Sequence, residues 1–187
     1  VAGGDFYLYN DDAISATSEY GNAYGVQALV KGADGSATVV NVGSIDASSV
    51  HGDATGVYLT ALGTNGSIVV GNSGTISASG YMAHGIYAQA YYGEYGQVSA
   101  FSDGLVTADA ERFAQGISVD GAVYALIDNA GQVEVNAVVG DGYGPAVLPF
   151  GTSQIAVAIA GCRQNPAAQP CRPLAKGARI DVLYAHS

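Results

Sequence analysis

Apolar and polar positions alternate along most of the chain in short segments, a pattern typical of β-strands rather than helices. In residues 72–78, for example, Ile76 and Ala78 share one face, whereas Thr75 and Ser77 share the other. Gly, Asn, Asp and Ser separate these segments, and these residues favour turns. The pattern therefore predicts an all-β chain built from many short strands.

The alternating segments recur at a nearly constant interval. A first motif, Asn-x-Gly-x-Ile-x-Ala, carries a branched apolar residue, and its copies contain Ile14, Ile45, Ile76, Val106 and Val133. A second motif, Gly-apolar-x-apolar, begins at Gly25, Gly56, Gly85, Gly116 and, in a poorer form, Gly144. A third begins at a turn glycine, at Gly35, Gly66, Gly96 and Gly121. An internal period of about 30 residues indicates a repeat architecture.

Three strands per repeat predict a parallel β-solenoid (β-helix) of triangular section, in which equivalent residues stack. We expect about five three-strand coils of about 30 residues, at residues 13–42, 43–73, 74–103, 104–130 and 131–160. The alternative, an antiparallel sandwich, does not require like residues at one fixed period. Asn41, Asn72 and Asn129 occupy the same inward-facing position, just before the turn glycine of the first motif. Ser102 occupies this position in the copy that contains Val106. We therefore expect side-chain hydrogen bonds between successive coils.

Segments on either side of the solenoid depart from the repeat. Residues 1–12 contain the alternating Phe6-Tyr-Leu-Tyr9 and are predicted to form an N-terminal cap or edge strand. Residues 13–160 form the predicted solenoid, and residues 161–187 a cysteine loop followed by a basic C-terminal strand. In that strand the apolar residues alternate with polar ones, and we expect it to be detached from the repeat.

The two cysteines, Cys162 and Cys171, enclose a proline-containing loop. A lone pair with this spacing predicts a disulfide, and hence an oxidising compartment. Two free thiols are the alternative. A metal site would need two further ligands, which no nearby His or Cys supplies.

Charge is divided unevenly along the chain, whose net charge is −10. Residues 1–161 carry 15 acidic side chains against Lys31 and Arg112, whereas residues 162–187 carry four basic side chains against Asp181. An acidic body argues against nucleic acid as a partner. No apolar run has membrane-spanning length, and no signal-peptide pattern begins at Val1, so this residue is either a mature terminus or a fragment boundary.

The Asn-x-Gly-x-Ile-x-Ala and Gly-Ile-x-Ala motifs of about residues 10–160 resemble the passenger repeats of bacterial autotransporter and haemagglutinin-type surface proteins. That resemblance implies a right-handed parallel β-helix and a location outside the cell or on a bacterial surface. Passengers of this kind include adhesins, cytotoxins and enzymes, so the resemblance specifies architecture more than activity. The chain departs from the family in having no room for a translocator barrel.

Candidate catalytic residues are few. Asp109 and Glu134 lie on adjacent coils of the predicted first strand stack, as a polysaccharide lyase or hydrolase would need, although such a pair is more often a solvated edge. His51 and His84 are expected in the loop between the first and second segments of neighbouring coils, where they have no third ligand. We assign no catalytic, cofactor-binding or metal-binding residue from the sequence, and we expect no cofactor.

The 13 tyrosines are the more suggestive feature. Tyr58 and Tyr87 should stack on adjacent coils, and exposed aromatic residues often mark contact surfaces. The candidate contacts with a glycan or a host or cell-surface protein are Tyr58, Tyr87, Tyr91, Tyr92 and Tyr95.

The function expected from these features is non-catalytic: a self-associating, extracellular β-solenoid subunit of a fibre, sheath or surface layer. Strand-like segments at both ends, and opposite charges on body and tail, predict a head-to-tail homopolymer. The expected assembly contacts are Phe6, Leu8, Arg179, Ile180, Val182 and Tyr184. The alternatives are an adhesin or autotransporter passenger fragment that binds glycan or protein, and a polysaccharide-degrading enzyme.

Overall fold

The computed structural model describes residues 4–91, 95–121, 124–139 and 141–144, and beyond these five strand segments by their backbone alone. The described chain is an all-β parallel solenoid without a helix, with about four coils of about 31 residues. Accordingly, none of its elements is a helix long and apolar enough to cross a membrane. The sequence predicted five coils, but the last interval, 131–160, is described only in part.

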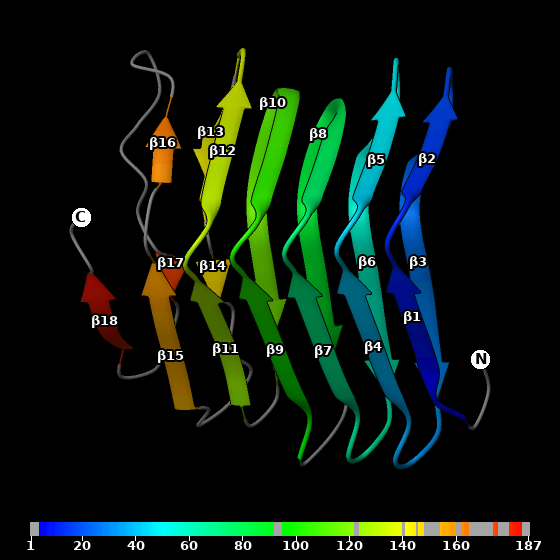
Figure 1. The fold of residues 1–187 in the computed structure, drawn as a ribbon, viewed down its shortest axis with the longest axis vertical. Helices are drawn as coiled ribbons and strands as arrows, with labels where there is room; N and C mark the ends of the chain where they lie inside the picture. Colours follow the sequence, from blue (N-terminus) through cyan, green and yellow to red (C-terminus); the bar gives the residue numbers. More distant parts are fainter. Residues whose placement is uncertain are drawn as a thin grey trace.

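One face of the solenoid is a seven-stranded parallel sheet, which lies in the lower front of Figure 1. Its strands follow the order β1 (Phe6–Asn10), β4 (Ser36–Asn41), β7 (Ser67–Asn72), β9 (Gln97–Ser102), β11 (Tyr124–Asn129), β15 (Gln154–Ile159) and β18 (Ile180–Tyr184). The register advances by one repeat at each step, so that Phe6 pairs with Ala37 and Ala37 pairs with Ile68. Like residues therefore stack on like.

The second sheet has eleven strands and supplies the other two sides of each coil. Its upper part contains β2 (Ala13–Ser18), β5 (Ser44–Ser49), β8 (Thr75–Ala90), β10 (Leu105–Asp120), β12 (Gln132–Ala137) and β16 (Cys162–Gln164). The returning side, which lies behind in Figure 1, contains β3 (Ala23–Lys31), β6 (Ala54–Leu62), the ends of β8 and β10, β13 (Asp141–Tyr143), β14 (Ala146–Val147) and β17 (Leu174–Ala175).

In two coils the first and second segments merge, which the three-strand scheme did not predict. Both β8 and β10 run for 16 residues around the corner without a turn. Ser48 pairs with Ser79, whereas Ala54 pairs with Ala83, so the third coil is two residues shorter at this corner than the second. The shorter connection leaves no room for a separate turn, and the strand bends instead.

The core is a narrow column of stacked Ala, Val, Ile and Leu side chains inside the solenoid. Ile45, Ile76 and Val106, predicted to be equivalent, pair across successive strands and are fully buried. Narrowness imposes a close approach at the first four glycines of the second motif, which lie within strands rather than in turns. A Cβ on Gly56 would lie 2.4 Å from Ile76 Cγ2 and 2.7 Å from the Gly85 carbonyl oxygen.

The two flanking segments belong to the same sheet. β1 pairs with β4 in the regular register, and β18 pairs with β15 in the same parallel sense. The expectation that residues 180–184 form a strand is confirmed, but the strand is not detached from the repeat. The expected pairing of Cys162 with Cys171 lies outside the described side chains, among which no disulfide is found.

Candidate functional sites

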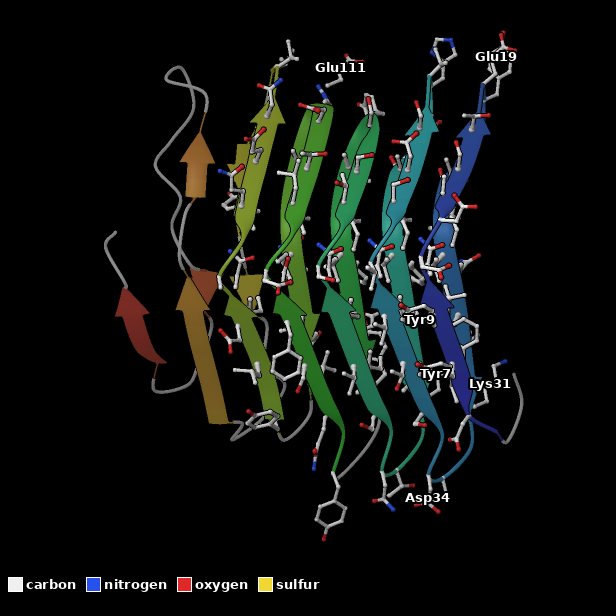
Figure 2. The ribbon with its side chains drawn as sticks, viewed as in Figure 1. Tyr7, Tyr9, Glu19, Lys31, Asp34 and Glu111 are labelled. Carbon is white, nitrogen blue, oxygen red and sulfur yellow. The ribbon has the colours of Figure 1, made fainter. Side chains whose placement is uncertain are left out.

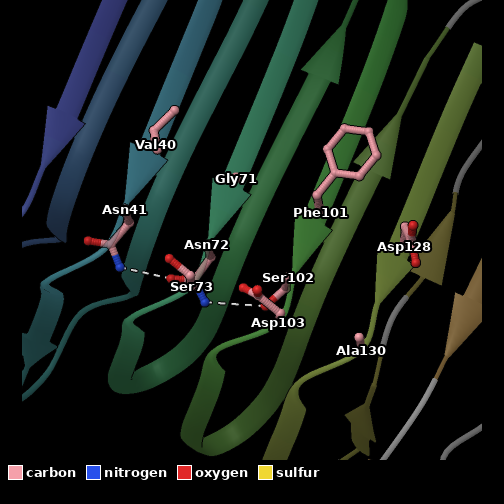
Figure 3. Close-up of a pocket in the computed structure, with 10 residues that line it drawn as sticks. All are labelled: Val40, Asn41, Gly71, Asn72, Ser73, Phe101, Ser102, Asp103, Asp128 and Ala130. Atoms are coloured by element: carbon pink, nitrogen blue, oxygen red, sulfur yellow. Dashed lines mark hydrogen bonds between the residues drawn. The ribbon is translucent and has the colours of Figure 1, made fainter.

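Buried asparagines form a hydrogen-bonded ladder along the solenoid, as the sequence predicted. Asn41 Nδ2 donates to Asn72 Oδ1 at 2.8 Å, and Asn72 Nδ2 donates to Ser102 Oγ at 3.2 Å (Figure 3). Each amide also donates to a carbonyl of its own turn, and Asn41 reaches the Thr75 carbonyl of the next coil. Because these side chains are buried, the ladder satisfies polar groups that water cannot reach.

The ladder extends one step further than the sequence analysis proposed, to Asn10 at the end of β1. Asn10 Nδ2 donates to Asn41 Oδ1 at 2.8 Å, and to the carbonyls of Asp12 and Ser44. Its own Oδ1 accepts no hydrogen bond from any residue that the structure describes. The signal was present in the sequence, because Asn10 precedes Asn41 by the 31 residues of one repeat.

Two strands of equal length lie at the opposite ends of the seven-stranded sheet. β1 is one end strand and β18 the other, each five residues long and running in the same direction. Phe6 and Leu8 are half-buried on the core side of β1, whereas Tyr7 and Tyr9 project outward and are 67% and 53% exposed (Figure 2).

At the other end, register places the remaining candidates of the assembly contact. Ile180 and Val182 pair with Ile155 and Val157 of β15. Tyr184 pairs with Ile159, which itself pairs with Asn129, so Tyr184 occupies the row of the asparagine ladder. Arg179, the last candidate, lies outside the described residues.

A shallow groove of about 310 Å³ crosses the outer surface of the seven-stranded sheet beside the ladder (Figure 3). Its floor is Gly71, which pairs with Val40 on one side and with Phe101 on the other. A Cβ on Gly71 would meet no atom within 4 Å. This glycine is therefore not required by packing, in contrast to Gly56.

A second hollow, of about 320 Å³, lies at the corner between the first and second segments and is lined by Tyr81, Asp109 and Glu111 among others. Arg112 lies 5.8 Å above the Tyr81 ring. Asp109 pairs with Asn136, and Glu134 pairs with Thr107, so the two carboxylates considered for catalysis are diagonal neighbours on one face. Only Asp109 of this pair lines the hollow.

Aromatic rings form a continuous series of contacts across the returning side of the solenoid. The predicted stack of Tyr58 on Tyr87 is confirmed, with ring centroids 5.4 Å apart and an interplanar angle of 10°. Further contacts of 5.3–5.6 Å extend the series in both directions. We name the set the aromatic track; its members are Tyr24, Tyr58, Tyr87, His84, Phe113 and Tyr143.

Beside the aromatic track runs a polar row of Thr60, Gln89 and Asp120. Register pairs Thr60 with Gln89, and Gln89 with Asp120. All three are buried, at 5–6% exposure, although they face outward. Tyr87 Oη donates to Gln89 Oε1 at 2.9 Å, but Thr60 Oγ1 and Asp120 Oδ1 have no hydrogen-bond partner.

Burial also changes the acidity of these groups. It raises the pKa of Asp120 to about 6, and it raises the pKa of Tyr87 to about 12, with the nearby Tyr91, Tyr58 and Asp120 adding to the effect. Burial lowers the pKa of His84, against the opposing influence of Gln115 and Asp53. His84 Nδ1 is buried without a partner. Sequence analysis missed Thr60, Gln89 and Asp120, although each stands two residues after an outward Tyr58, Tyr87 or Ser118.

The other sequence candidates do not gather in one place. His51 stacks on Tyr20, whereas His84 contacts Tyr87 and Phe113, so these histidines have different ring partners. No group of three or more metal-ligating side chains occurs in the described part of the chain.

Tyr91 and Tyr95 are the other tyrosine candidates that the structure describes. Tyr91 follows β8 and adds to the raised pKa of Tyr87. Tyr95 is 59% exposed at the following turn, and Tyr92 lies outside the described residues. Comparison of the chain with protein-family models, with curated proteins and with solved structures gives no match.

Proposed function

We propose that this protein is a non-catalytic, extracellular structural protein whose solenoid associates head to tail with further copies of itself in a fibre, sheath or surface layer. The observation that carries the proposal is the open edge of β1, where the backbone edge and Asn10 Oδ1 both lack a partner in the described chain. An open parallel edge is a template for another strand.

The second copy fits this edge by continuity. β18 runs parallel to β1 and has the same number of residues, so a copy translated along the solenoid axis brings five residues opposite five. In that register the rows of Ile180 and Val182 continue into those of Phe6 and Leu8. A contact of this kind is heterologous and does not close, so it builds filaments.

Charge supports the same arrangement. Residues 162–187 carry four basic side chains against a single acidic one, whereas residues 1–161 are strongly acidic. Stacking copies head to tail sets the basic end of one against the acidic body of the next, and complementary charge accelerates and orients association.

Substitutions on the two sides of one strand test the proposal. Leu8→Lys introduces a charge on the core side of β1, where the next copy stacks, and should abolish assembly. Tyr9→Lys introduces the same charge on the outer side of that strand, where the side chain is 53% exposed, and should leave assembly intact. Negative-stain electron microscopy and sedimentation velocity over a range of concentrations measure the assemblies.

Both variants should retain the β-type circular dichroism of the unchanged chain, because a half-buried lysine at the end of the core can extend its amine into water. A chain that stays monomeric at all concentrations refutes the proposal. So do assemblies that persist in Leu8→Lys, because the β1 edge would then not form the contact.

A second candidate is a surface-exposed passenger-type adhesin fragment, in keeping with the repeat motifs. The aromatic track favours it, because rings in continuous contact at the surface of a rigid solenoid are suited to binding a glycan or a protein. Cell-adhesion assays with the purified chain test it. Substituting Tyr58 and Tyr87 together should lower adhesion while filament formation is unchanged.

A further inference from the structure

We propose that the aromatic track and the polar row together form a binding site for an uncharged, linear polysaccharide that lies along the solenoid axis. This inference rests on the second candidate function, for which it supplies the ligand class and the binding residues. It is independent of head-to-tail assembly, since β1 and β18 belong to the other sheet.

The direction of the ligand follows from the ring contacts. Tyr24, Tyr58 and Tyr87 belong to successive coils, and their rings follow one another at 5.5 and 5.4 Å. This interval is close to the spacing of parallel strands, about 4.8 Å, and is comparable with the length of one sugar residue. A chain laid along the axis can therefore contact one coil per sugar, over rings that remain partly exposed.

The chemistry of the ligand follows from the unpartnered polar atoms. Thr60 has an unpaired hydroxyl, Asp120 an unpaired carboxyl oxygen and His84 an unpaired ring nitrogen, all on the outward side of three successive coils. Buried polar groups without partners are unusual in native structures and call for an explanation. Hydroxyl groups complement all three, since a hydroxyl donates to the carboxyl and imidazole and accepts from threonine.

Charge selects against acidic chains. Residues 1–161 carry Lys31 and Arg112 as their only basic side chains against 15 acids, so the body repels uronates and sulfated glycans. Arg112 is engaged above Tyr81 at the corner and lies outside the aromatic track. Neighbouring side chains shield the unpaired atoms of the polar row from solvent. A bound polysaccharide must therefore displace some of these side chains.

Binding is measured first on an array of neutral and acidic linear oligosaccharides, and then by calorimetry with the neutral hexasaccharide that binds best. Intrinsic tyrosine fluorescence gives a second readout, because the chain contains no tryptophan. Tyr87→Ala removes a central ring and should raise the Kd about tenfold. Asp120→Asn keeps the shape of the side chain but loses a charge-assisted hydrogen bond, and should raise the Kd about fivefold or more.

The matched control is Tyr20→Ala, which removes a 77% exposed tyrosine outside the aromatic track and should leave the Kd unchanged. Tyr87→Phe retains the ring and keeps the test informative if the alanine variant does not fold. The Kd of this variant should stay within about threefold of that of the unchanged chain. The inference is overturned if no neutral glycan on the array binds, if acidic chains bind better than neutral ones, or if the Tyr87 and Tyr20 variants lose affinity equally. If cell adhesion persists when neutral glycans fail to bind, the second candidate function survives with a different ligand. Microscopy of the same samples reports on assembly separately.

Discussion

Replacement of Asn41 by alanine should destabilise the solenoid far more than its single side-chain amide suggests. Asn41 is fully buried in the ladder, where it accepts from Asn10 and donates to Asn72 Oδ1 and the Thr75 carbonyl. Asn10 keeps two other acceptors when Asn41 is removed. The Asn72 residue is only 3% exposed. Its Oδ1 loses the Asn41 donor and gains no other.

The magnitude follows from these contacts. The unpaired Asn72 oxygen costs about 1–3 kcal/mol, and the three other hydrogen bonds of the Asn41 side chain, with Asn10, Gly43 and Thr75, together contribute about 1 kcal/mol net, giving about 3 kcal/mol in total. For a chain of this size that loss lowers Tm by about 6–12 °C. Asn41→Ser should cost least among substitutions, because Ser102 already fills one place of the ladder with a hydroxyl.

Urea unfolding, followed by both far-ultraviolet circular dichroism and tyrosine fluorescence, measures the effect. Coincident transitions establish two-state behaviour before free energies are compared. The control is Asn65→Ala: Asn65 Nδ2 donates to Asp34 Oδ1 at 2.6 Å from one coil to another, but on an exposed turn. Water replaces that partner, so the cost should stay below about 1 kcal/mol.

The double variant Asn41→Ala with Asn72→Ala adds a sharper criterion. Removing both partners eliminates the unpaired oxygen, so the double variant should lose at least about 1 kcal/mol less than the sum of the single losses. Equal effects at positions 41 and 65, or strict additivity within the pair, would refute the argument that buried polar satisfaction stabilises the stack.

Three further outcomes are expected. Gly56→Ala should destabilise by about 3 kcal/mol or prevent folding, because its Cβ collides with Ile76 and with the Gly85 carbonyl. Gly71→Ala, in the same assay, should stabilise by about 0.5 kcal/mol, since its Cβ meets open space and the unfolded chain loses entropy; a loss of stability would mean that the groove floor cannot take a methyl group. Burial raises the pKa of Asp120 to about 6. Between about pH 4 and pH 6 the folded state therefore binds more protons than the unfolded chain, and the contribution of this carboxyl to stability falls as pH rises through that window. The Tm of Asp120→Asn minus that of the unchanged chain should therefore increase from pH 4 to pH 7, and a pH-independent difference would contradict this.

The register could be predicted because stacking in a parallel solenoid follows directly from the period. Placing Ile45 and Ile76 in one row determines the pairing of the first motif, including Asn41 with Asn72. Aligning the glycines of the second motif gives the pairing of Tyr58 with Tyr87, and the observed pairs agree. The partner of each residue lies one repeat away, so the pairing follows from the spacing of the motifs alone. The Asn ladder and the tyrosine stack follow from that rule.

The role of the second-motif glycines could not be predicted from the same pattern. A glycine chosen for a positive φ and one chosen for lack of space look identical in sequence, and Gly56 is of the second kind. Ala54 and Val57 both belong to the core although strict alternation would put them on opposite faces, so the period breaks at this glycine. The break places His84 beside Tyr87 rather than in a loop.

The same contacts account for the stability of the solenoid and for the proposed behaviour of its ends. Within the stack, each coil gives its backbone edge and its ladder side chain to the coils on both sides, so the amides of Asn41 and Asn72 gain partners in both directions. At β1 this arrangement continues on one side only: Asn10 donates inward to Asn41 and presents an acceptor outward. An added coil would therefore gain the hydrogen bonds that an interior coil has, without any specialised contact surface. In the proposed assembly, repetition itself supplies the interface, and side chains on the core side of the end strand, such as Leu8, determine whether it is used.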